Sequence, residues 1–167
     1  MKADIYSFGI IMAEMSTGKP PFFDIEYDEI LAIQICKGLR PEFAEGTPEC
    51  YTQLALQCMD ANPFKRPTAS DIHDKLIRWH DIVNYSDAKN QNELAILRAF
   101  QSADETILTL LTEFPIYPKN KLASKLLNFK NLSERINTSS VELLNIYGSG
   151  NSISDDLYAI YSPLSEE

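Results

Sequence analysis

The sequence predicts an all-α fold for its first eighty or so residues, and three observations support this. Apolar side chains recur at helical spacing in four segments, 4–17, 27–37, 47–59 and 68–80. Proline and glycine stand between these segments, where helices stop and loops begin. Hydrophobic residues make up 44% of the 167-residue chain and charged residues 23%, which is compatible with a buried core.

The first helix is expected over residues 4–17. Its apolar residues include Ile5, Phe8 and Met12, and further apolar side chains fill the other faces. A helix that is apolar nearly all round is normally buried on every side. Gly18 is the expected C-terminal stop, and the Lys19-Pro20-Pro21 run that follows prevents continuation.

Local signals also mark the later helices. The second is expected to end at Gly38. Thr47 is expected to cap the third with its hydroxyl, because Pro48 and Glu49 follow as first-turn residues. Thr68 is expected to begin the fourth, with Asp71 three positions later as in a capping box.

The character of the chain changes beyond residue 83. We interpret residues 1–83 as one helical unit and the polar stretch 84–92 as a linker. Residues 93–144 form a tail that is expected to be partly helical, because apolar residues such as Leu94, Leu97 and Leu108 suit amphipathic helices. Residues 145–167, rich in serine and ending in two glutamates, are expected to be disordered.

Charge and cysteine content exclude several function classes. The net charge is −9 and both halves are acidic, so no basic surface for nucleic acid is expected. Cys36, Cys50 and Cys58 have no metal-binding spacing, and we assign no metal site. The apolar run 5–15 is far shorter than the ~20 residues that a bilayer span requires. We therefore expect a soluble, cytoplasmic protein without membrane contact.

Four sequence blocks resemble the last part of a protein kinase large lobe. Residues 4–9 (Asp-Ile-Tyr-Ser-Phe-Gly) are similar to the segment that opens the central helix of that lobe, and residues 17–22 (Thr-Gly-Lys-Pro-Pro-Phe) continue it. Residues 38–41 resemble the loop after the next helix. Residues 58–68 resemble the family's Cys-Trp-x-x-x-Pro-x-x-Arg-Pro-Ser/Thr run, with Met59 in place of the tryptophan. The residues of these blocks are most similar to those of the tyrosine-kinase-like and tyrosine kinase branches of the family.

The resemblance implies structural roles for a few positions. The aspartate matching Asp4 holds the catalytic loop through backbone N–H groups, whereas the local sequence alone allows a plain helix cap. The arginine matching Arg66 pairs with a glutamate at the end of the activation segment, whereas the alternative is a solvated charge. The remaining structural family positions are Ser7, Gly9, Pro63 and Pro67.

The sequence lacks the motifs of kinase chemistry. It has no Gly-rich loop, no His-Arg-Asp, no Asp-Phe-Gly and no Ala-Pro-Glu, and in family order these precede the segment containing Asp4. We assign no catalytic or cofactor-binding residue, and ATP and Mg²⁺ belong to the parent kinase. The hypothesis is a catalytically inactive C-terminal fragment of a protein kinase.

The alternative is a non-catalytic kinase-like interaction module or a helical adaptor. In either case we expect protein partners or the missing kinase lobe to bind, and self-association through the apolar first helix.

Overall fold

The part of the chain that the computed structural model describes comprises residues 2–107, Thr109 and Asn137. All regular secondary structure in this part is helical, as the all-α prediction required, and it contains no strand. Five α-helices and one 3₁₀ turn follow in order: α1 (Lys2–Thr17), α2 (Glu29–Cys36), α3 (Glu49–Cys58), η1 (Pro63–Lys65), α4 (Ala69–Tyr85) and α5 (Gln91–Ile107).

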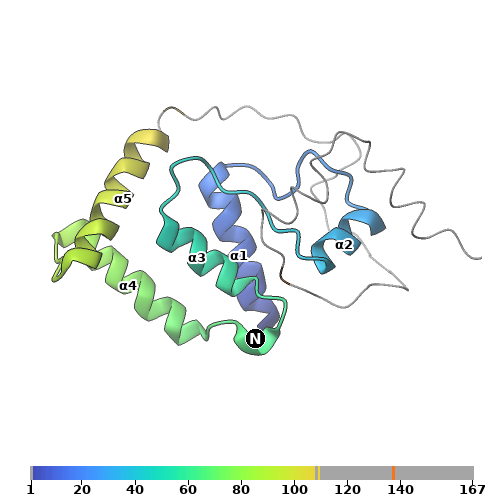
Figure 1. Ribbon diagram of the computed structural model, residues 1–167, viewed down its shortest axis with the longest axis horizontal. Helices are drawn as coiled ribbons and strands as arrows, with labels where there is room; N and C mark the ends of the chain where they lie inside the picture. The colour runs from blue at the N-terminus through green and yellow to red at the C-terminus, as the bar shows by residue number, and fades with distance from the viewer. Residues whose placement is uncertain (1, 108, 110–136, 138–167) are drawn as a thin grey trace, which may run out of the picture.

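The centre of the fold is the contact between α1 and α3 (Figure 1). The two helices approach closely at Gly9, where a β-carbon would lie 2.7 Å from the Ala55 carbonyl oxygen. The Tyr51 hydroxyl of α3 donates a hydrogen bond of 2.9 Å to the Met12 carbonyl of α1. Around this contact lies the buried core: Ile5, Met12, Leu54, Ala55, Cys58, Met59, Ile72 and Trp79.

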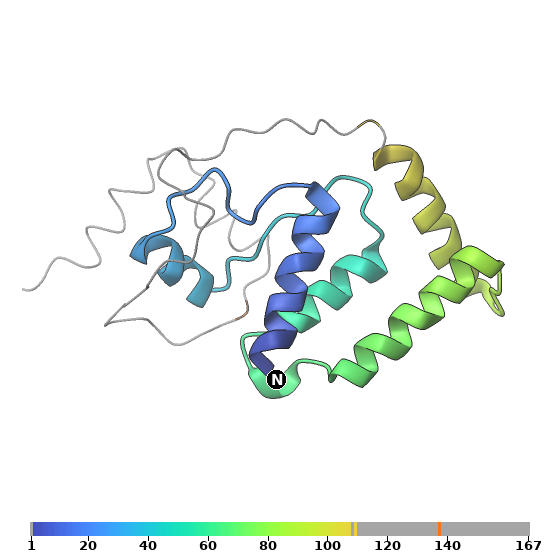
Figure 2. The same ribbon diagram turned by 180° about the vertical axis from the view of Figure 1, so that it is seen from behind.

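Helices α4 and α5 form a hairpin on one side of the central pair, and α2 lies on the other side (Figures 1 and 2). The Trp79 ring of α4 packs against the Phe100 ring of α5, with their centroids 5.7 Å apart. Phe100 also packs against the main core, so α5 belongs to the same folded unit as α1. This helix lies beyond the four segments that carry the kinase resemblance.

The helix ends agree with the local signals except at α3. Thr68 and Asp71 form the predicted capping box of α4. Gly18 ends α1 with a positive φ of 66°, a conformation that glycine adopts without steric cost. The prediction that Thr47 caps α3 is wrong: Pro48 is the N-cap, and the Thr47 hydroxyl donates to the Ala44 carbonyl at 2.7 Å.

The apolar surface of α1 is only partly covered in this chain, as the expected self-association through this helix requires. Ile5, Met12 and Ala13 are buried, but the side chains of Ile11 and Met15 remain 51% and 70% exposed. The covered stripe faces α3, because only that helix packs along α1 over its length. The main neighbours of α1 among residues 2–107 are α3 and η1.

The predicted tail is described only in part. Helix α4 continues to Tyr85 and α5 begins at Gln91, so both helices enter the stretch interpreted as a linker. Helix α5 occupies the start of the predicted tail, up to Ile107. The rest of the 93–144 tail, apart from Thr109 and Asn137, and the segment 145–167 that is expected to be disordered lie outside the described residues. No helix within the described ranges is both long enough and apolar enough to span a bilayer.

Candidate functional site

Arg66 is a buried cation at the end of η1, with only 6% of its surface exposed. Its Nε donates to the Asp60 carbonyl and its Nη1 to the Lys2 carbonyl, each at 2.8 Å. The guanidinium carbon also lies 5.0 Å from the centre of the Tyr6 ring, within the range of a cation–π contact. Arg66 therefore joins η1 to the first turns of α1.

The turn before Arg66 is shaped by local polar contacts. The Asn62 side chain accepts a hydrogen bond from the Phe64 amide, and Pro63 opens the 3₁₀ turn that follows. The Arg66 amide then donates to the Pro63 carbonyl at 3.3 Å. In return, Lys2 Nζ donates to the carbonyls of Arg66 at 2.5 Å and Pro67 at 3.4 Å. Residues 63–67 are thus held against the start of α1.

The other predicted site residues lie along α1 and do not share one cluster. Asp4 is an exposed residue of the first turn of α1. Ser7 is exposed, and its hydroxyl donates to the Ala3 carbonyl at 3.3 Å. Gly9 is buried in the contact with α3. The structure brings Pro63, Arg66 and Pro67 to the start of α1, whereas Gly9 serves helix packing.

Arg40 is a second bridging arginine, which the sequence reasoning treated only as part of a motif. Its Nε donates to the Met59 carbonyl at 3.0 Å, and its Nη1 donates to the carbonyls of Ile35 and Leu39 at 3.0 and 2.8 Å. It lies 5.8 Å from the centre of the Tyr6 ring, which is also the ring beneath Arg66. An arginine directly before a loop proline was the available sequence signal, but the carbonyl partners of Arg40 lie in α2, in the loop after α2 and at the end of α3.

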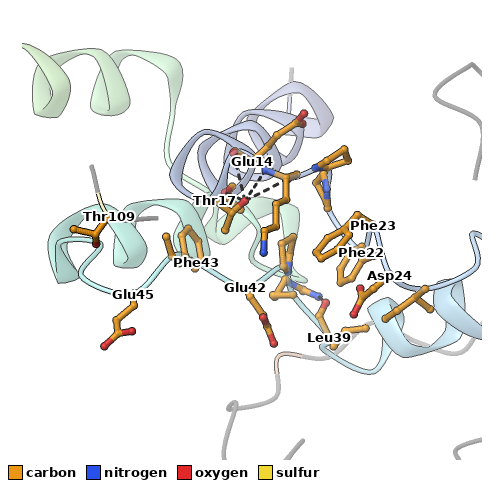
Figure 3. A pocket seen from close by; sticks show the side chains of 18 residues that line it. Glu14, Thr17, Phe22, Phe23, Asp24, Leu39, Glu42, Phe43, Glu45 and Thr109 are labelled. Carbon is orange, nitrogen blue, oxygen red and sulfur yellow. Dashed lines mark hydrogen bonds between the residues drawn. The ribbon is translucent and has the colours of Figure 1, made fainter. Parts of the chain in front are cut away.

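A cavity of about 570 Å³ opens between the end of α1, the loop that precedes α2 and the loop that precedes α3 (Figure 3). Its volume is within the usual range of protein binding sites. Phe22 and Phe23 line one side and Phe43 the other. Further lining comes from Glu14, Thr17, Lys19, Asp24, Leu39, Arg40, Glu42, Glu45 and Thr109.

Two features of the cavity wall are an unusual backbone conformation at Phe22 and a hydrogen bond from Tyr27 to the backbone. Phe22 adopts a φ of +56°, a left-handed conformation that a bulky side chain rarely takes. The Tyr27 hydroxyl donates to the neighbouring Pro21 carbonyl at 2.7 Å. Burial raises the pKa of Tyr27, and the negative charges of Glu14 and Asp24 raise it further. The phenol therefore remains protonated and keeps its donor role.

The three cysteines are free thiols, with Cys36 and Cys58 buried and Cys50 half-buried. Burial is the main cause that raises the pKa of Cys50 and of Cys58, so both remain in the less reactive thiol form at neutral pH. They act as small apolar side chains of the core.

The similarity to known proteins lies in the N-terminal part of the chain, which contains α1 to α3 and the start of α4. Residues 1–76 match the family model described as protein tyrosine and serine/threonine kinase. This match covers fewer than half of the 167 residues, so this similarity to protein kinases is confined to the first helices of the chain. Among the relatives, the probable serine/threonine-protein kinase drkA of Dictyostelium discoideum is 37% identical over 86 residues, which is 52% of this chain. No solved structure matches the chain.

Other relatives are also kinases by name. The probable serine/threonine-protein kinase pats1 of Dictyostelium discoideum is 34% identical over 77 residues, or 46% of this chain. The putative serine/threonine-protein kinase/receptor R818 of Acanthamoeba polyphaga mimivirus is 38% identical over 71 residues, or 42% of the chain. The matched parts span only 13%, 2% and 4% of the lengths of drkA, pats1 and R818.

Proposed function

We propose that residues 1–83 form the C-terminal helical part of a protein kinase large lobe, from the tyrosine-kinase-like branch. The whole kinase transfers the γ-phosphate of ATP to a protein hydroxyl. The match of residues 1–76 to the kinase family model supports this proposal, as do relatives named as serine/threonine-protein kinases. The proposed setting is the cytoplasm, where protein partners or the remaining kinase segments bind these helices.

The observation that carries the proposal is the burial of Arg66. A solvated surface arginine would be exposed, whereas Arg66 is 6% exposed and donates to two carbonyls. A guanidinium has five N–H donors in a planar fork that matches the two oxygens of a carboxylate. The proposed role of Arg66 is to receive the glutamate at the end of the activation segment, which fixes that segment on the large lobe.

The same proposal assigns no catalytic residue to this chain. Phosphoryl transfer depends on holding nucleotide, metal and hydroxyl together. The motifs that bind ATP and Mg²⁺ are not found in the 167 residues. We therefore propose that the chain by itself is inactive and that Asp4 and Arg66 support catalysis only within a complete kinase domain.

A chimeric kinase tests this proposal. The segment of drkA that matches this chain is replaced by the corresponding residues of this chain, and autophosphorylation is measured with radiolabelled ATP. The expected result is an active chimera whose rate falls at least about tenfold when Arg66→Ala is introduced, because the activation segment loses its anchor. The 167-residue chain assayed alone should transfer no phosphate.

The control is Phe64→Ala, which changes a side chain 91% exposed two positions from Arg66. The chimera carrying it should keep its activity. A well-folded chimera without activity, or equal rates with and without Arg66, would contradict the proposed role.

A non-catalytic interaction module is the second candidate, because the cavity between the loops before α2 and α3 suits a bound peptide. Copurification of the short chain from cells with one protein in fixed stoichiometry would favour this candidate. Loss of that complex on mutation of the cavity would locate the interface.

A further inference from the structure

The cavity carries more negative charge than its neighbours neutralise. Four carboxylates line it, and none of them forms an ion pair in the part of the chain that the structure describes: Glu14, Asp24, Glu42 and Glu45. Two cations, Lys19 and Arg40, also line the cavity, so four carboxylates against two cations leave it a net charge of −2. Lys19 Nζ lies 5.2 Å from the centre of the Phe23 ring, and Arg40 donates to backbone carbonyls. The cavity therefore combines a net negative charge with walls formed by phenylalanine rings.

One segment of the chain has the complementary composition. Residues 110–136 contain five of the fifteen basic residues and two of the 24 acidic residues, a net charge of +3 in a chain of net charge −9. Lys119, Lys121 and Lys125 lie within seven positions of one another. Apolar residues alternate with them, including Leu122 and Leu126. Such a segment suits a surface that is both acidic and aromatic.

Both residues that flank this segment are described, one in the cavity and the other in a neighbouring hollow that shares Arg40 with it. Thr109 lines the cavity itself (Figure 3). At the other end, the Asn137 side-chain oxygen accepts a hydrogen bond of 2.9 Å from the Ala61 amide. It also lies 3.5 Å from Nη2 of Arg40, which lines the cavity. A chain of 27 residues reaches roughly 90 Å when extended, far more than a return across one small cavity needs.

We propose that residues 110–136 dock in this cavity of their own chain, with their lysines against its carboxylates and their leucines against its phenylalanines. Intramolecular tethering raises the effective concentration of a short linked segment to about the millimolar range, so weak contacts suffice for binding. The proposal does not depend on the kinase function. It assigns the cavity an internal occupant that any external peptide would have to displace.

Chemical cross-linking of the full chain tests the contact directly. A carbodiimide joins a lysine amine to a carboxylate as an amide with loss of water, and only where the two groups touch. We expect cross-links from Lys119, Lys121 or Lys125 to Glu42 or Glu45, identified by mass spectrometry. An equal mixture of unlabelled and ¹⁵N-labelled chains should give cross-links within one isotope. Mixed-isotope cross-links would overturn the proposal in favour of a second copy.

Limited trypsin digestion measures the docked population, because cleavage in a fast equilibrium follows the open fraction. The double variant Glu42→Gln and Glu45→Gln should be cleaved after Lys119, Lys121 and Lys125 about tenfold faster than the unmodified chain. Both glutamates are exposed, so the amides should not disturb folding. Raising the salt to about 1 M should also speed cleavage of the unmodified chain, because the screening length falls to about 3 Å.

The matched control is Glu105→Gln, an exposed glutamate of α5 outside the cavity. It should leave the cleavage rate unchanged. Equal cleavage of the unmodified chain and the double variant, with no cross-links to the cavity, would overturn the proposal.

Discussion

At the scale of single residues, Gly9 shows how one missing side chain determines a helix contact. A β-carbon at this position would lie 2.7 Å from the Ala55 carbonyl oxygen and 2.8 Å from Met59 Cγ. Distances below 3.0 Å require the neighbour to move, and the nearest one is backbone. The requirement at position 9 is therefore set by α3, a helix that begins forty positions later.

We predict that Gly9→Ala destabilises the fold by about 1–3 kcal/mol, the usual cost of overpacking a core. Helix propensity alone predicts the opposite sign, because alanine favours a helix over glycine by about 1 kcal/mol. Urea unfolding followed by circular dichroism measures the difference. Ser7→Ala, an exposed change on the same helix, should stay within about 0.5 kcal/mol. Increased stability of Gly9→Ala would contradict this prediction, because it would mean that α3 shifts to accommodate the methyl group without a net cost.

At the scale of elements, the junction between α4 and α5 is held by Arg78. Its guanidinium donates to the Glu93 carboxylate at 2.7 and 2.9 Å and to the Asp87 carboxylate at 2.7 Å. The Lys89 amide also donates to Glu93 at 2.7 Å. The stretch interpreted as a linker is therefore pinned to both helices by ionic contacts, and α5 packs as a fixed element.

These contacts make the hairpin sensitive to acid. The hydrogen bond from Arg78 is the main cause that lowers the pKa of Glu93 from 4.5 to about 2, and Arg78 also lowers the pKa of Asp87. A carboxyl group with a lower pKa in the folded state stabilises that state above its unfolded pKa. This contribution is lost as the pH falls from about 4.5 to about 2.

We predict that Glu93→Gln lowers the urea midpoint at pH 6, and that the difference from the unmodified chain shrinks towards zero near pH 2. Unfolding curves at pH 6, 4 and 2.5 provide the measurement. Glu105→Gln, on an exposed site of α5, should cause no such pH-dependent difference. A constant difference across the whole range would mean that the ionic contact does not contribute to folding.

At the scale of the whole molecule, the helices surround α1 incompletely. Ile11 and Met15 are exposed on its surface, and α5 approaches only the Met15 end, where Phe100 and Ile107 line a shallow groove with it. Exposed apolar groups of this kind favour association with other protein surfaces. In the proposed kinase, other parts of the large lobe would cover them.

We predict that the purified chain self-associates and that Ile11→Gln with Met15→Gln weakens this association at least about tenfold. Burying one such side chain contributes about 1.5–3 kcal/mol, and 1.4 kcal/mol corresponds to a factor of ten. Sedimentation equilibrium measures the dissociation constant. Ile77→Gln, an equally apolar exposed position on α4, should leave it unchanged. A monomeric unmodified chain at high concentration would contradict the prediction.

The sequence by itself determined the helical class, the approximate helix positions, the Thr68–Asp71 capping box and the kinase-like segments. Each of these features depends on residues within a few positions of one another, so it can be recognised from the local spacing of residue types in the sequence. It missed the cap of α3 and the roles of Arg40 and Arg78. The tertiary structure decided these, because burial and ion pairing depend on which surfaces meet. A guanidinium that joins α2 and the loop after it to the end of α3, as Arg40 does, leaves no periodic signal along the chain.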